Sequence, residues 1–356
     1  MMLSFLRKND MKNRYRYSPD EYYGRIYDTH ASPFENLTEK ADYAVKCEEI
    51  RQKIGDTLAI ENIPLKIDKL KPEILKTESR KNYSVSTMSV EICEGLNMLC
   101  YVLEPKGEAK SGIVAFCGHG YGCRQIIRQS KRGKYRILNF LDNYQKNFAG
   151  ALAENGHLVI VPEPIGFGEA KLKKDFVKPF YSSSCDTLSH HSLLYGFSAA
   201  SMRVYQVRRC IDILEQKYSI NEIGIMGISG GGLVALYSSC VDARISKTCV
   251  CGYINTFRTS VLRMWHCPDN YIPGLLKIGD MYDFASALAP KKLMMEFGTD
   301  DKLFPIEGSR LARDKIAAVY DAAGCSENFF GVEFKGKHEV YLPEALKFFD
   351  EGGKEK

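Results

Sequence analysis

The sequence predicts an α/β protein built on a doubly wound, mostly parallel β-sheet. Short, mostly apolar runs alternate with segments of helical periodicity along the second part of the chain. Strands of a parallel sheet are covered by helices on both faces, so continuous apolar runs are typical of them. The runs are residues 113–117, 158–161, 223–228, 247–253 and 293–297.

Helices are expected between these runs, and two further strands before them. The helical segments are residues 147–155, 194–217, 232–240 and 306–323, and a last strand at 329–334 precedes a closing helix at 343–349. Residues 86–92 and 98–103 have the composition of strands, with Gly95 in the turn between them. We therefore expect one main domain over residues 86–356.

Residues 1–85 are expected to form a helical extension packed on that domain. The stretch Ser18-Pro19-Asp20-Glu21 combines a capping serine, a proline and a glutamate in the order typical of a helix start. Residues 38–58 carry apolar side chains at the spacing of one helix face, namely Ala44, Cys47, Ile50, Ile54 and Leu58. No linker rich in Gly, Ser or Pro follows, which argues against a separate module.

Composition excludes several classes of partner. The chain has 49 Lys and Arg against 44 Asp and Glu, and this net charge of +5 is too small to indicate nucleic-acid binding. The apolar stretch at residues 223–241 holds clustered glycines, so a strand, turn and helix explain it better than a membrane span. We expect neither a nucleic-acid nor a membrane partner.

The 12 cysteines indicate a reducing compartment. No two of them form a C-x-x-C pair, which argues against a zinc site or a thioredoxin-like site. Many lie inside apolar runs, where cysteine packs as a small hydrophobic residue. Because the N-terminal segment also lacks the pattern of a secretory signal, we expect a cytoplasmic protein.

The main functional signal is Gly227-Ile228-Ser229-Gly230-Gly231, between an expected strand and an expected helix. A tight strand-to-helix turn exposes a serine hydroxyl above a sheet, and glycines on both sides relieve the crowding of the backbone there. A glycine-rich turn without catalytic role is the alternative. The strand before and the helix after favour Ser229 as a nucleophile.

A nucleophilic serine needs a base and an acid that orients the base, and in this topology they follow in the order acid, then histidine. The loop at residues 298–305 offers Asp301 as the acid, with Asp300 as the alternative. Both aspartates could instead cap the next helix. His338 is the only histidine after this loop, so we expect it to be the general base.

The negative charge that develops in the reaction needs two backbone N–H donors, which form the oxyanion hole. Gly230 directly follows the nucleophile and is expected to supply one. The loop Gly118-His119-Gly120-Tyr121-Gly122 follows an apolar run, and we expect the N–H of Tyr121 to supply the other. An ordinary glycine turn is the alternative for this loop.

Two long excursions, at residues 164–192 and 255–290, follow the ends of expected strands, at the edge where open α/β sheets bind ligands. Within the second excursion, Trp265, Met264 and Tyr271 are candidates to line the substrate pocket. Packing of the loop on the core is the alternative for these three side chains.

Taken together, these motifs resemble those of the α/β-hydrolase superfamily, and more narrowly those of its acetyl xylan esterase and dienelactone hydrolase-like branch. Residues 270–276, and Ser184-Cys185-Asp186 with the pair His190-His191, are similar to stretches of that branch. The similarity spans most of residues 40–350.

The resemblance implies a catalytic domain over residues 86–356 with a triad of Ser229, Asp301 and His338, which hydrolyses a small-acyl ester of a carbohydrate or another small molecule. It implies no metal or organic cofactor. A true dienelactone hydrolase has a cysteine nucleophile, so the serine at 229 argues against that activity. A serine peptidase or thioesterase on the same scaffold is the alternative function, and a binding protein that has lost catalysis is a third.

Overall fold

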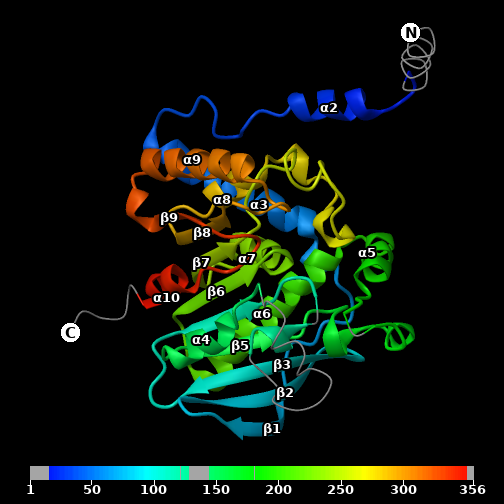
Figure 1. Ribbon diagram of the computed structural model, residues 1–356, viewed down its shortest axis with the longest axis vertical. Coiled ribbons are helices and arrows are strands. Elements are labelled where there is room, and N and C mark those ends of the chain that lie inside the picture. Colours follow the sequence, from blue (N-terminus) through cyan, green and yellow to red (C-terminus); the bar gives the residue numbers. More distant parts are fainter. Residues whose placement is uncertain (1–15, 121, 128–143, 180, 351–356) are drawn as a thin grey trace, which may run out of the picture.

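The structure is a computed structural model that describes residues 16–120, 122–127, 144–179 and 181–350. Over these residues a single nine-stranded sheet runs through the molecule in the order β1-β2-β3-β5-β4-β6-β7-β8-β9 (Figure 1). The strands are β1 (Glu73–Ser79), β2 (Tyr83–Cys93), β3 (Leu96–Pro105), β4 (Gly112–Phe116), β5 (Leu158–Pro162), β6 (Ile223–Ile228), β7 (Ile245–Cys251), β8 (Lys292–Gly298) and β9 (Phe329–Phe334).

The six strands from β5 to β9 in this order are mutually parallel, and β1, β2 and β3 form an antiparallel edge. The strand order reverses around β4, which pairs with β5 on one side and with β6 on the other. This is the doubly wound, mostly parallel sheet that the sequence predicts. The strands β4 and β6 end next to each other, so the loops that follow them lie at the same edge of the sheet.

Helices cover both faces of the sheet. They are α2 (Asp20–Asp28), α3 (Lys40–Leu58), α4 (Phe148–Glu154), α5 (Cys185–Leu194), α6 (Ala199–Tyr218), α7 (Gly230–Val241), α8 (Met281–Ser286), α9 (Ile306–Ala322) and α10 (Leu342–Asp350). Side chains of α3, α6, α7, α8 and α9 form one apolar core, and those of α4 and α10 form the other. Neighbouring residues of one strand enter opposite cores, as Ile225 and Met226 do in β6, because side chains alternate along a strand.

The N-terminal segment differs in part from its expected structure. Helix α3 lies where a helix was expected and packs against α7, with Cys47, Ile50, Ile54 and Leu58 buried, but Ala44 is exposed. Helix α2 begins at Asp20, with Pro19 at its N-terminal end; the Ser18 hydroxyl accepts the backbone N–H of Asp20 at a long 3.4 Å and donates to the Asp20 carboxylate at 2.6 Å.

Two further elements correct the expectation. Residues 73–79 form the edge strand β1, which the sequence analysis included in a helical extension; its side chains are almost all exposed, so no apolar alternation marks it. The helix expected over residues 194–217 is confirmed as α6, but it begins at Ala199, because residues 195–198 separate it from a preceding helix, α5. Helix α5 ends at Leu194, and Ser198 begins α6 through a reciprocal cap with Ser201.

Among the described residues, no helix combines the length and the apolar character that crossing a bilayer requires.

Candidate active site

Ser229 lies in a strained turn between β6 and α7. Its φ of 58° and ψ of −123° are unusual for a residue with a side chain, and such strain is common at functional sites. The turn depends on the absence of side chains on both sides: a Cβ on Gly227 would lie 2.1 Å from the carbonyl oxygen of Gly231, and one on Gly231 would lie 2.1 Å from that of Phe116. The two glycines therefore have the role that the motif predicts.

The acid loop after β8 meets the loop after β9 at the same edge of the sheet. His338 Nδ1 and Asp301 Oδ2 are 2.7 Å apart, and the Asp301 side chain is almost completely buried. The other oxygen of Asp301 accepts the N–H groups of Leu303 at 2.8 Å and Phe304 at 3.0 Å, so the carboxylate is held in one orientation. Asp300, the alternative acid, is half exposed and pairs with Lys335.

The imidazole of His338 stacks against two aromatic rings. It stacks on Tyr144 and on Phe304, with ring centroids 5.7 Å apart in both cases. Its Nε2 is buried and has no hydrogen-bond partner among the described residues. Because Asp301 holds Nδ1, the lone polar atom of the ring that is available to a reactant is Nε2.

Gly252 connects this imidazole to the serine turn. The N–H of Ser229 donates to the carbonyl of Cys251 at 2.9 Å. A Cβ on the next residue, Gly252, would lie 3.1 Å from Cε1 and Nδ1 of His338 and 3.6 Å from the Asp301 carboxylate. The structure therefore brings the candidate nucleophile, base and acid around one short segment after β7, although 109 residues of sequence separate Ser229 from His338.

The candidate oxyanion donors are described in part. Gly230 is the first residue of α7, where backbone N–H groups have no partner within the helix. Tyr121 lies outside the described residues. In the same loop, Gly118 lies against the serine, since a Cβ added to Gly118 would lie 3.3 Å from the Cβ of Ser229. The N–H of Gly118 already donates to the side chain of Gln145 at 2.8 Å.

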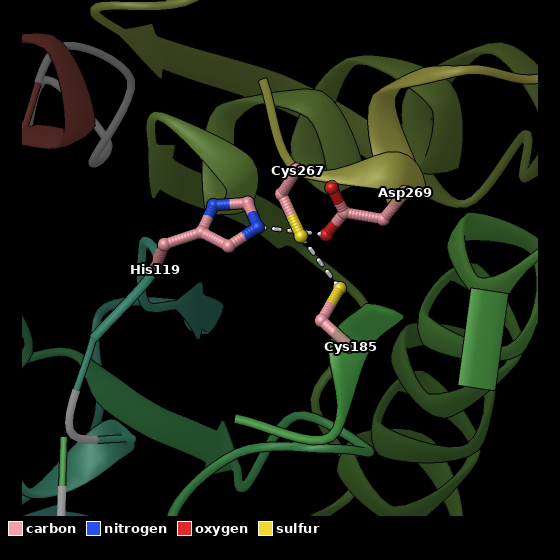
Figure 2. Close-up of side chains that lie close together, drawn as sticks. All are labelled: His119, Cys185, Cys267 and Asp269. Atoms are coloured by element: carbon pink, nitrogen blue, oxygen red, sulfur yellow. Dashed lines mark hydrogen bonds and ion pairs between the residues drawn. The ribbon is translucent and has the colours of Figure 1, made fainter. Parts of the chain in front are cut away.

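A buried polar cluster beside the serine turn was missed by the sequence analysis. His119 Nε2 lies 2.9 Å from Asp269 Oδ2, and the guanidinium of Arg203 donates to the same oxygen (Figure 2 shows the first contact). Burial opposes a charge on His119, but the carboxylate of Asp269 outweighs it and raises the pKa of this imidazole to about 9. A Cβ on Gly230 would lie 2.5 Å from this ring, so a cationic imidazole adjoins the expected oxyanion donor.

Cys185 and Cys267 complete this cluster (Figure 2). One donor atom from each of His119, Cys185, Cys267 and Asp269 lies within 4.8 Å of the others, as in many metal sites. The fit to a metal is poor, because the buried cation of Arg203 donates to two of the four donors, Asp269 and Cys185. A second group, Cys249, Cys251 and Glu296, is similarly close but wholly buried.

The candidate pocket residues lie in different environments. Met264 lines a shallow hollow of about 480 Å³ that also includes Asp301. Trp265 is 82% exposed, and Tyr271 donates its hydroxyl to the carbonyl of Val261 at 3.0 Å. Neither of these two residues lines that hollow.

The fold is that of the α/β-hydrolase architecture. A "putative acetyl xylan esterase" of Bacteroides fragilis superposes with a TM-score of 0.72 at 15% identity, over 88% of this chain and 82% of that one. A glucuronoyl esterase of Solibacter usitatus superposes with a TM-score of 0.61 at 14% identity, over 84% and 91%. These likenesses confirm the α/β-hydrolase fold expected from the motifs.

In sequence, the chain is 25% identical over 287 residues to the "Putative hydrolase YtaP" of Bacillus subtilis, which covers 78% of this chain and 90% of the relative. No family model matches the chain.

Proposed function

We propose that this protein is a serine hydrolase that cleaves a carboxylic ester, with Ser229 as nucleophile, His338 as general base and Asp301 as the residue that orients the base. The observation that supports the proposal most directly is the hydrogen bonding of the two ring nitrogens of His338. Asp301 holds Nδ1 of His338 at 2.7 Å, while the buried Nε2 has no hydrogen-bond partner in the described part of the chain and lies next to the segment that also holds the serine turn. This is the arrangement that the two-step acyl transfer of a triad requires.

In the first step, Nε2 of His338 accepts the hydroxyl proton of Ser229 as the oxygen attacks the ester carbonyl. Asp301 stabilises the imidazolium that forms, and the N–H of Gly230 donates to the oxyanion. We assign the second oxyanion donor to the N–H of Tyr121. The imidazolium then protonates the departing alcohol, and water releases the acid from the serine ester by the reverse sequence of proton transfers.

We infer that the substrate is a small-acyl, most simply an acetyl, ester of a carbohydrate or another small molecule. The names of the two structural neighbours support a carbohydrate ester as the substrate, and the name of the relative from Bacillus subtilis supports hydrolysis in general. The serine at 229 supports the esterase side of the branch over dienelactone hydrolysis. The twelve free thiols support a cytoplasmic location.

A panel of acetyl esters, thioesters and peptide amides tests the reaction class, with Ser229→Ala as the inactive reference. We expect hydrolysis of p-nitrophenyl acetate to fall on the order of 10⁴-fold in Ser229→Ala. Faster turnover of the thioester or the amide than of every ester would instead favour a thioesterase or a serine peptidase. Unchanged ester hydrolysis in Ser229→Ala would reject the proposal.

A further inference from the structure

Two cysteines beside the serine turn lie closer than ordinary packing allows. Cys185 is the first residue of α5, and Cys267 lies in the excursion after β7, 82 residues further along the chain. Their Sγ atoms are 2.9 Å apart, with the thiol of Cys267 donating to Cys185. A covalent S–S bond is about 2.05 Å long, so the two sulfurs are within about 1 Å of bonding distance.

The surroundings favour a thiolate on Cys185. Nη2 of Arg203 lies 3.2 Å from its Sγ, and this guanidinium is only 2% exposed. The hydrogen bond from Cys267 and the charge of Arg203 lower the pKa of Cys185, and the same hydrogen bond raises that of Cys267. The contacts therefore place a sulfur that favours the thiolate form directly against one that favours the thiol form.

One residue of the pair is partly exposed. Of the twelve cysteines, all of which the structure describes, Cys267 is the only one that is not buried. A small oxidant can therefore approach the pair at Cys267, next to the imidazole of His119, whose side chain is 29% exposed.

The distances fit a covalent link better than a metal. Two thiolates bound to one tetrahedral zinc ion are roughly 3.8 Å apart, given Zn–S bonds of about 2.3 Å, so a zinc ion would have to separate the sulfurs. Arg203 already donates to Cys185 and to Asp269, and a divalent cation would have to share both ligands with this buried cation. A disulfide does not require Cys185 and Asp269 to be shared with a second cation, and its formation removes the negative charge of the Cys185 thiolate.

We propose that Cys185 and Cys267 are a modification site, at which a peroxide converts the two thiols into a reversible disulfide. The Cys185 thiolate attacks one oxygen of hydrogen peroxide, the O–O bond breaks, and the hydroxide that leaves takes up a proton to become water. Cys267 then attacks the sulfur of the resulting Cys185 sulfenic acid, the S–O bond breaks, and the departing hydroxide takes the Cys267 proton. In sum, one thiolate, one thiol, one peroxide and one proton from solvent give one disulfide and two waters.

The link would join α5 to the excursion that carries Asp269, the partner of His119. It depends on none of the steps of the proposed hydrolysis. Cys249 and Cys251 provide an internal comparison, since their Sγ atoms are 3.8 Å apart but both are buried, and burial raises the pKa of each thiol. We expect this second pair to stay reduced.

Peptide mapping of the folded wild-type protein tests the proposal. The protein is reduced, freed of reductant, exposed to a small molar excess of hydrogen peroxide, alkylated and digested with trypsin. Cleavage places Cys185 alone in the peptide 175–203, Cys267 alone in 264–277, and the comparison pair in 248–258. We expect a species with the summed mass of the first two peptides less two hydrogens, which a dithiol converts back to the separate peptides.

The rate of linking should exceed any oxidation of peptide 248–258 by about tenfold or more, because thiolate character and access set reactivity. In Cys267→Ser, dimedone should trap a sulfenic acid on Cys185, and Cys325→Ser should link as the wild type does. Recovery of both peptides alkylated and unlinked from the folded wild type would overturn the proposal. So would one equivalent of zinc in the purified wild type that Cys185→Ser loses.

Discussion

Replacement of Asp301 by asparagine tests the orientation of the base, and the structure defines what is lost. Asp301 Oδ1 accepts two backbone N–H groups, so an asparagine oxygen can occupy that place and the loop can keep its conformation. The amide nitrogen then faces His338 Nδ1, where Oδ2 accepts at 2.7 Å in the wild type. Two donors cannot share one hydrogen bond, so the imidazole must adopt the tautomer whose Nε2 carries the proton and cannot act as base.

The same change in a serine triad elsewhere lowers kcat on the order of 10⁴-fold, which corresponds to about 5.5 kcal/mol of transition-state stabilisation. We expect a loss of this size for Asp301→Asn in p-nitrophenyl acetate hydrolysis under saturating substrate, with KM nearly unchanged. Asp300→Asn is the matched control, because Asp300 is exposed and its ion pair with Lys335 should contribute little. A loss of less than about tenfold in Asp301→Asn, or equal losses in the two variants, would refute the reasoning.

Three further changes have expected outcomes. Gly230→Ala should lower kcat by about 10²-fold or more, because the new Cβ would lie 2.5 Å from the His119 ring and displace an oxyanion donor. Gly24→Ala is the control, because its Cβ would meet none of the described residues within 4 Å, and equal activities of the two variants would contradict this role. Asp269→Asn should destabilise the fold by about 3–5 kcal/mol in urea, since it leaves a buried guanidinium without its carboxylate, and a smaller loss would argue against that ion pair. Burial raises the pKa of Glu296 from 4.5 to about 7, so the protonated carboxyl stabilises the fold below pH 4.5, and this contribution is lost as the pH rises from there to about 7. Glu296→Gln should therefore exceed the wild type in stability by up to ~3 kcal/mol at pH 8, with the difference vanishing below about pH 4; a difference independent of pH would contradict the assignment.

The sequence predicts those parts of the fold and site that local patterns encode. The strands β4, β5 and β6 are apolar throughout, and β7 and β8 are mostly apolar and buried, so each is marked by its own residues. The serine turn is likewise local, because Gly227 and Gly231 must lack side chains for β6 and α7 to meet as they do. The contact between Asp301 and His338 was expected from topology, because in this fold the acid and then the histidine follow the nucleophile along the chain.

The parts that could not be predicted depend on contacts between distant segments. Arg203 and Asp269 are 66 residues apart, and His119 and Asp269 are 150 apart, so no spacing in the chain marks their cluster. One signal was present: Arg203 lies among apolar residues on the buried face of α6, where an unpaired charge would be costly. Such a residue predicts a buried partner, but it does not identify Asp269. Strand β1 was not predicted because its side chains are almost all exposed, so its residues show no apolar alternation.

Covalent labelling with a fluorophosphonate tests the central claim most directly, namely that His338 activates Ser229 as a nucleophile. The account predicts one adduct per chain, located on Ser229 in the tryptic peptide 218–244, and labelling should be abolished in Ser229→Ala. It also predicts that His338→Gln, folded as the wild type by circular dichroism, reacts at least about 10³-fold more slowly. An adduct on another residue, or undiminished labelling of Ser229 in His338→Gln, would contradict the account.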